Sequence, residues 1–182
     1  MSRICVFCGS AQGRSPRYRD TAEHVGRTLA ERGIGLVYGG GNVGLMGAVA
    51  DAAVRAGGEA IGVIPRRLAE REVAHDGLTQ LHVVETMHER KALMTELSDA
   101  FLTLPGGFGT LDELFEAITW RQLGFHDKPC GLLDVDGYFD GLLAFIDRAV
   151  DDGFVRPGDR SRLVRGDDAG AVIDELLSSG HV

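Results

Sequence analysis

Short apolar runs alternate with amphipathic helical patterns along most of the chain, and this alternation constrains the fold more than any other feature of the sequence. The expected strands are Ile4–Cys8, Gly35–Tyr38, Ala60–Ile64, Leu81–Val84, Ala100–Leu104 and Gly131–Val135. The expected helices are Pro16–Arg32, Gly44–Ala56, His88–Leu97, Thr110–Leu123 and Tyr138–Asp151. Strands that are apolar throughout and separated by helices are typical of a parallel sheet covered on both faces. The sequence therefore predicts a doubly wound α/β fold.

The length of 182 residues suits one domain with a substantial core, and we expect a single domain over residues 1–182. The part that follows about residue 153 is a polar C-terminal tail. It contains a weak strand pattern at Arg162–Arg165 and a last helical pattern at Ala169–Leu177.

Composition argues against several classes of partner. The net charge is −8 and no block of Lys and Arg stands out, so a nucleic-acid partner is not expected. No apolar run approaches the roughly 20 residues that a membrane span needs, and no charged-then-apolar leader opens the chain. These features favour a cytoplasmic enzyme or binding protein that acts on a small molecule.

The three cysteines Cys5, Cys8 and Cys130 cannot all pair, and the first two lie inside an apolar run. We interpret them as reduced, buried thiols. The six histidines are scattered rather than closely spaced, so neither a metal site nor a bound cofactor is expected.

Glycine-rich segments follow three of the expected strands. In a doubly wound sheet, ligands bind outside the carboxyl ends of the strands, where the segments Cys8-Gly9-Ser10, Gly39-Gly40-Gly41 and Pro105-Gly106-Gly107 fall. The glycines Gly39, Gly41 and Gly44 formally match the dinucleotide fingerprint. That fingerprint normally follows the first strand and needs an acid at the end of the next one, whereas Glu59 precedes its strand. A phosphate or nucleotide loop and a loop that only permits tight packing both remain open here.

The expected helix at 88–97 carries an arginine on its apolar face. Thr86 and Glu89 form a capping-box pattern that marks the start of this helix. The apolar face consists of Met87, Leu93, Met94 and Leu97, and Arg90 falls in its middle, with Lys91 next to it. Because guanidinium keeps its charge, Arg90 must reach solvent, pair with a carboxylate or bind an anionic ligand. A structural ion pair and a ligand contact both remain open.

In the stretch 100–116, an apolar run ends at a proline, crosses three glycines and restarts as a helix. Such a helix N-terminus suits an anion, because its first N–H groups are free. Thr110 and Glu113 form a second capping-box pattern, which gives Glu113 a purely structural explanation. On the helical wheel, Leu111, Leu114, Phe115 and Ile118 form the core face, whereas Glu113, Glu116 and Trp120 share the opposite face. This second face favours a functional role for Glu113 and an interface.

Four segments resemble the LONELY GUY family, the cytokinin riboside 5′-monophosphate phosphoribohydrolases. They are VFCGS at 6–10, YGGGNVGLMG at 38–47, MHERK at 87–91 and PGGFGTLDE at 105–113, the last of which matches the family pattern PGGxGTxxE. The resemblance spans roughly residues 3–150. It implies a Rossmann-like homodimer that cleaves the N-glycosidic bond of a nucleoside 5′-monophosphate, releasing a free base and ribose 5-phosphate.

The resemblance also implies which residues act. Arg90 and Glu113 are the expected catalytic residues. The nucleotide contacts that the resemblance implies are Glu72, Lys91, Gly107, Phe108, Gly109, Thr110, Leu111, Asp112 and Thr119. We also expect substrate contacts from Gly9, Ser10, Gly40, Gly41, Gly106 and Glu116. The preferred base stays open among adenine, an N6-prenylated adenine and a pyrimidine.

Two other functions are compatible with the same fold. Relatives of this family have carried a lysine decarboxylase label, but pyridoxal phosphate needs a Schiff-base lysine, and this chain has only Lys91 and Lys128. The other alternative is a non-catalytic carrier of a nucleotide or cofactor. We prefer catalysis, because a binder of phosphate alone gains nothing from adjacent carboxylates.

Overall fold

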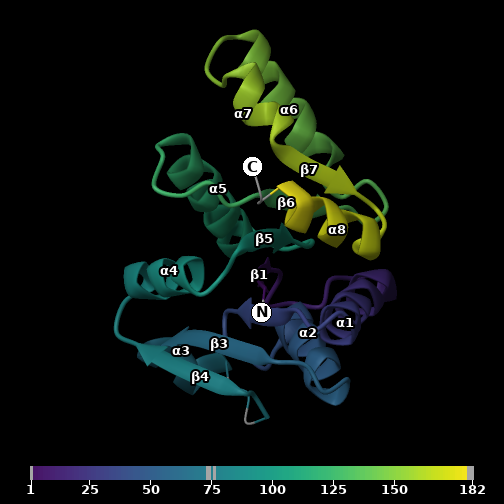
Figure 1. Ribbon diagram of the computed structural model, residues 1–182, viewed down its shortest axis with the longest axis vertical. Helices are drawn as coiled ribbons and strands as arrows, with labels where there is room; N and C mark the ends of the chain where they lie inside the picture. Colours follow the sequence, from purple (N-terminus) through teal and green to yellow (C-terminus); the bar gives the residue numbers. More distant parts are fainter. Residues whose placement is uncertain (1, 73–74, 76, 180–182) are drawn as a thin grey trace.

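The computed structural model describes residues 2–72, 75 and 77–179, and its centre is one seven-stranded sheet (Figure 1). The strands are β1 (Arg3–Phe7), β2 (Gly35–Tyr38), β3 (Ala60–Pro65), β4 (Gln80–Val84), β5 (Ala100–Thr103), β6 (Cys130–Leu133) and β7 (Leu163–Gly166). Their spatial order is β4-β3-β2-β1-β5-β6-β7, and every neighbouring pair is parallel. The predicted Rossmann-like α/β fold is confirmed.

Helices cover both faces of this sheet. They are α1 (Pro16–Glu31), α2 (Gly44–Arg55), α3 (Arg66–Glu72), α4 (Met87–Glu96), α5 (Phe108–Gln122), α6 (Asp140–Asp151), α7 (Pro157–Ser161) and α8 (Ala169–Ser179). The short helices α3 and α7 are absent from the sequence-based prediction. Their sequences RRLAERE and PGDRS are too short and too polar to show an apolar period.

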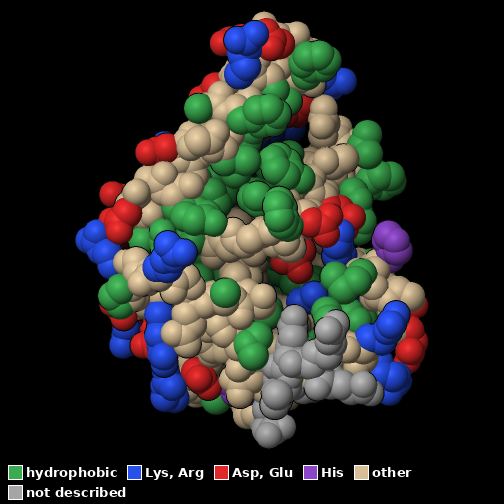
Figure 2. Space-filling model, turned by 180° about the vertical axis from the view of Figure 1, so that it is seen from behind, with side chains coloured by type: hydrophobic (Ala, Val, Ile, Leu, Met, Phe, Trp, Pro, Cys, Tyr) green, Lys and Arg blue, Asp and Glu red, His purple; other side chains and the backbone are tan. Residues whose placement is uncertain are grey.

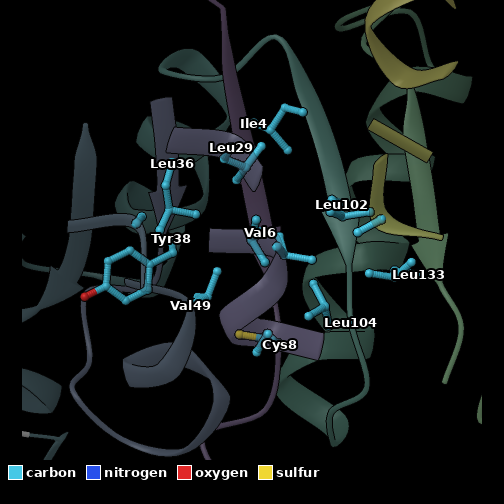
Figure 3. Close-up of a cluster of buried hydrophobic side chains, with 14 of the residues drawn as sticks. Ile4, Val6, Cys8, Leu29, Leu36, Tyr38, Val49, Leu102, Leu104 and Leu133 are labelled. Carbon is cyan, nitrogen blue, oxygen red and sulfur yellow. The ribbon is translucent and has the colours of Figure 1, made fainter. Parts of the chain in front are cut away.

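Two hydrophobic cores lie on opposite faces of the sheet. Residues of α1, α2 and α8 pack on one face and residues of α4, α5 and α6 on the other. In Figure 1, α1, α2 and α8 lie to the right of the sheet and α4 and α5 to the left. Alternate residues of β1 serve the two cores: Ile4 and Val6 face the first, and Cys5 and Phe7 the second. Figure 3 shows the first core, where side chains of α1 and α2 meet those of β1, β2, β5 and β6.

The polar tail is part of the sheet rather than an appendage. Strand β7 pairs with β6 along its whole length, and helix α8 buries Val172, Ile173 and Leu176 against the first core. The weak strand and the last helix expected in this segment are both present.

Four apolar positions are more exposed than the sequence predicts. Strand β4 is at the edge of the sheet, so Leu81 and Val83 remain accessible although a buried strand was expected. On α5, Phe115 is 38% exposed because it is turned about 100° away from Leu114, which faces the sheet. Met87 is 41% exposed at the first turn of α4.

The cysteines are free and buried, as expected. Burial raises the pKa of all three thiols, that of Cys130 to about 12, so they are protonated at neutral pH. Within residues 2–72, 75 and 77–179, no helix is long and apolar enough to cross a membrane. In the same part of the chain, no group of three or more His, Cys, Asp or Glu side chains is placed to hold a metal ion.

Candidate functional site

The carboxyl ends of β1 and β5 lie side by side, and the chain leaves them in opposite directions across the sheet. Such a topological switch point leaves a crevice between the two departing loops. A cavity of about 200 Å³ lies there, and its lining consists of Cys8, Ser10, Met46, Arg90, Gly107, Phe108, Gly109, Thr110 and Glu113.

The loops around this cavity pack backbone against backbone. The Gly9 amide donates to the Pro105 carbonyl at 3.1 Å, and the Leu45 amide donates to the Gly9 carbonyl at 2.9 Å. A Cβ atom on Gly106 would lie 2.1 Å from Thr110 Oγ1 and 2.9 Å from the Gly9 amide nitrogen. Only glycine fits at residue 106, and its absence of a side chain brings the first and third glycine-rich loops together.

Arg90 is only 6% exposed, and backbone carbonyls fix its guanidinium. Its Nε donates to the Val63 carbonyl and its Nη2 to the Gly39 carbonyl, both at 3.1 Å. These carbonyls lie at or near the carboxyl ends of β3 and β2. The Arg90 side chain therefore does not reach solvent, and its charge is held inside the protein.

Gly39 makes room for this arginine. A Cβ atom at residue 39 would lie 1.9 Å from Arg90 Nη2, which is far inside van der Waals contact. Gly39 was not among the expected site residues, although it opens the glycine triplet. The sequence did contain a signal for the role of Gly39, because a buried arginine needs a nearby position without a side chain.

The remaining nitrogen of Arg90 faces Glu113. The distance between Arg90 Nη1 and Glu113 Oε1 is 3.9 Å, and both side chains are largely buried. This separation makes an ion pair but exceeds a direct hydrogen bond between these two atoms. Both groups line the same cavity, so the structure brings together the two expected catalytic side chains.

The helix-cap explanation of Glu113 is wrong. Helix α5 begins at Phe108 with Gly107 as its N-cap residue, so Thr110 lies inside the first turn and is buried. The capping box predicted at Thr86 and Glu89 is present, with the Glu89 amide donating to Thr86 Oγ1 at 3.1 Å. Helix α5 begins before Thr110 because the glycines that precede this residue let the backbone pack closely and form a turn there.

The N-terminus of α5 opens onto the cavity. No side chain caps this helix, and positions 107 and 109 have free space where a Cβ would project. The first N–H groups of a helix have no partner inside the helix, so this end suits an anion. Phe108 is 93% exposed at the mouth of the cavity.

Lys91 connects α4 to α5 beside the cavity. Its Nζ lies 2.7 Å from Asp112 Oδ2 and 3.1 Å from Glu116 Oε2. Burial lowers the pKa of Lys91, but the hydrogen bonds to Asp112 and Glu116 outweigh that effect and the net pKa is raised. The lysine is thus a cation neutralised by two carboxylates, and Thr119 is exposed one turn beyond Glu116.

Several expected contact residues are not among those that line this cavity. Gly40 and Gly41 are buried, and a Cβ on Gly40 would lie 3.0 Å from Ile64 Cβ. Gly44 has a φ of +58°, and a Cβ there would lie 2.3 Å from the Ser10 carbonyl carbon. These contacts favour the tight-packing explanation of the second glycine loop. Leu111 is half-buried on α5, and the side chain of Glu72 lies outside the described residues.

Cys8 and Met46 line the cavity although they were not expected to. Both lie in segments that carried the family resemblance, VFCGS and YGGGNVGLMG. Apolar periodicity assigned them to the core, where their side chains are also largely buried.

Comparison with known proteins finds relatives that match this chain over nearly all of its length and over most of their own. A family model described as possible lysine decarboxylase matches residues 46–176. The cytokinin riboside 5′-monophosphate phosphoribohydrolase LOG3 of Arabidopsis thaliana is 51% identical over 174 residues, which cover 96% of this chain and 81% of that protein. A probable enzyme of the same name from Oryza sativa subsp. japonica, LOGL9, is 52% identical over 96% of this chain and 77% of its own. The chain belongs to the LONELY GUY family.

Solved structures share the fold at lower identity. The molybdenum cofactor carrier protein of Chlamydomonas reinhardtii superimposes with a TM-score of 0.74 at 21% identity, covering 97% of this chain and 98% of that one. A molybdenum cofactor binding protein from Rippkaea orientalis gives a TM-score of 0.73 at 24% identity, over 98% and 96% of the two chains. Identities this low show a common fold and nothing more. The function of this family member has to be argued from its own site.

Proposed function

We propose that this protein hydrolyses the N-glycosidic bond of a purine nucleoside 5′-monophosphate, either a cytokinin riboside 5′-monophosphate or AMP, to the free base and ribose 5-phosphate. One observation carries the proposal: the buried pair Arg90 and Glu113 lines the same cavity as the open N-terminus of α5. Relatives about half identical to this chain are named for this reaction.

The two parts of the site suit two parts of the substrate. The free N–H groups at the start of α5, around Gly107 to Thr110, suit the 5′-phosphate. The carboxylate of Glu113 suits the ribose, whose anomeric carbon becomes cationic as the base departs. A carboxylate beside an anion site is therefore useful for cleavage, whereas it would weaken simple phosphate binding.

Hydrolysis breaks the bond between the anomeric carbon and the base nitrogen and adds water to that carbon. The bonding electron pair leaves with the base, which acquires a proton. Glu113 stabilises the cationic sugar and accepts a proton from the attacking water. Arg90 contributes a fixed positive charge, either to the phosphate or to negative charge on the departing base.

The decisive experiment is chromatographic analysis of products. The purified protein is incubated with AMP, N6-isopentenyl-AMP and CMP and with the matching nucleosides. We expect free base from the monophosphates of purines and none from the nucleosides. The variant Glu113→Gln should lose at least about a hundredfold in kcat, because it keeps the shape and removes the charge. Glu175→Gln, on the exposed side of α8, is the matched control and should match wild type.

A comparison of kcat and KM separates the two roles of Arg90. Arg90→Lys keeps the charge but loses the fixed fork that the carbonyls of Val63 and Gly39 hold. A rise in KM with unchanged kcat assigns Arg90 to the phosphate, and a fall in kcat assigns it to the departing base. Wild-type turnover in both Glu113→Gln and Arg90→Lys would refute the catalytic proposal.

The two lysines disfavour the decarboxylase alternative. Lys91 is held as a cation by Asp112 and Glu116, whereas a Schiff base needs a neutral amine. Burial lowers the pKa of Lys128, but this residue precedes β6 and its Nζ donates to the Thr95 carbonyl, so it lies at the opposite end of the sheet from the cavity. The carrier alternative predicts tight binding of AMP with no release of base from any nucleotide.

We also propose that the protein is a cytoplasmic homodimer that pairs through α4 and α5. Exposed apolar side chains on or just after these helices support this arrangement: Met87, Phe115, Leu123 and Phe125. Figure 2 shows hydrophobic side chains gathered across the middle of one face of the molecule, with acidic side chains beside them. A patch of this kind is typical of a protein interface.

A further inference from the structure

Tyr138 lies outside every motif discussed above, yet it is bonded to the loop that leads into α5. Its hydroxyl donates to the Gly106 carbonyl at 2.6 Å, across 32 residues of sequence. Tyr138 belongs to the loop between β6 and α6, which none of the expected site residues occupies.

The loop that carries Tyr138 is firmly built. The Tyr138 amide donates to the Val135 carbonyl at 3.1 Å, closing a turn in which Asp136 and Gly137 have φ values of 54° and 75°. The Phe139 amide donates to the buried carboxylate of Asp134 at 3.2 Å. The phenol is therefore presented from a fixed backbone.

Two aromatic rings fix the direction of the Tyr138 side chain. Tyr18 of α1 meets it edge to face with centroids 5.8 Å apart, and Phe139 does so at 5.1 Å. Such contacts hold a ring in one orientation. The hydroxyl is thus aimed at Gly106 by elements on both sides of the loop.

The bond matters because of the peptide that it restrains. In a trans peptide the carbonyl of one residue and the N–H of the next point in opposite directions within one plane, and none of the described peptide bonds is cis. A donor that holds the Gly106 carbonyl therefore also sets the direction of the Gly107 N–H. Gly107 is the N-cap residue of α5 and lines the cavity.

Without this donor the direction of the Gly106 carbonyl would be less restrained. Both of its residues are glycines, which adopt many backbone conformations, and there is open space beside Gly107. A hydrogen bond to the carbonyl also polarises the peptide and makes its N–H a better donor to an anion.

We propose that Tyr138 is a positioning residue for phosphate recognition: its hydroxyl fixes the Gly106–Gly107 peptide so that the Gly107 N–H is oriented to bind the 5′-phosphate. The inference rests on the proposed function. It adds a contribution from the loop between β6 and α6 to a site otherwise built from β1, β2, β3, β5, α2, α4 and α5.

The test compares Tyr138→Phe with Tyr18→Phe. The first removes the hydroxyl that bonds Gly106 and keeps the ring, and the second removes a neighbouring hydroxyl and leaves the Gly106 bond in place. For Tyr138→Phe we expect KM for the nucleoside 5′-monophosphate to rise about fivefold with kcat within about twofold of wild type, since one hydrogen bond is lost. Tyr18→Phe should match wild type in both constants.

Direct titration with inorganic phosphate and ribose 5-phosphate keeps the inference separate from the proposed function. We expect both to bind Tyr138→Phe about fivefold more weakly than wild type, whereas inhibition by free adenine stays unchanged. Loss of adenine and phosphate affinity together would indicate a general structural defect and overturn the inference, as would equal phosphate affinity in wild type and Tyr138→Phe. Should the wild type release no base from any nucleotide, the proposed function fails, and the phosphate titration still decides the role of Tyr138.

Discussion

At the scale of single residues, the site depends on positions where a side chain is missing. Neither Gly39 nor Gly106 has a positive φ, and each is needed because a neighbour occupies the space of a Cβ. Gly39 adjoins the guanidinium of Arg90, and Gly106 adjoins Thr110. These two glycines therefore control the positions of functional groups rather than the turns themselves.

The substitution Gly39→Ala tests this control. The new methyl group would lie 1.9 Å from Arg90 Nη2, so the guanidinium must move. We expect kcat to fall by about tenfold to a hundredfold, because displacements of about 1 Å in a catalytic group have costs of that order. The measurement is steady-state base release, together with thermal unfolding to show that the variant is folded.

Gly141→Ala is the matched control, because position 141 lies on α6 with open space around it. It should keep wild-type turnover. An unchanged kcat in Gly39→Ala would contradict the proposed dependence of Arg90 on Gly39.

At the scale of elements, two sets of hydrogen bonds hold α4 in place. Its capping box satisfies the backbone at its start, where the Glu89 carboxylate accepts from the Glu85 and Thr86 amides. Arg90 fastens the same turn to the carbonyls of Val63 and Gly39. The cap thus contributes to stability, while Arg90 determines where the helix sits over the site.

The substitution Thr86→Ala separates these contributions. We expect it to lower the free energy of unfolding by about 1 kcal/mol, as the loss of an N-cap side chain generally does, with kcat changed less than about twofold. Urea denaturation and base release measure the two effects. Thr95→Ala, within the same helix, should leave stability nearly unchanged, and a stability loss in Thr95→Ala equal to that in Thr86→Ala would argue against the cap.

At the scale of the whole molecule, the exposed apolar side chains on α4 and α5 predict a dimer. Sedimentation equilibrium should give twice the 19.5 kDa of the chain. Phe115→Glu should give a monomer, because a buried charge without a partner opposes association. Phe154→Glu, the same change at a more exposed phenylalanine beyond α6, should remain a dimer. A monomeric wild type, or dissociation caused by Phe154→Glu alone, would refute this interface.

The sequence alone specified the layers of this protein and much of its chemistry. Periodicity reports which side chains are buried, so it located each of the strands and all but two short helices, α3 and α7. It also singled out Arg90, because a guanidinium on an apolar face is a local conflict that is visible without a structure. The motif PGGFGTLDE predicted an anion site beside Glu113, which stays a prediction.

Only the tertiary structure decided which distant segments meet. The strand order places β1 beside β5 and brings the ends of β2 and β3 to Arg90. The roles of Gly39 and Gly106 therefore follow from long-range contacts that no periodicity encodes. The start of α5 at Phe108 removed the cap explanation of Glu113, and the loop after β6 brought Tyr138 to Gly106. Local propensity fixes the elements of a chain, whereas the packing of one element on another fixes which of its residues can act together.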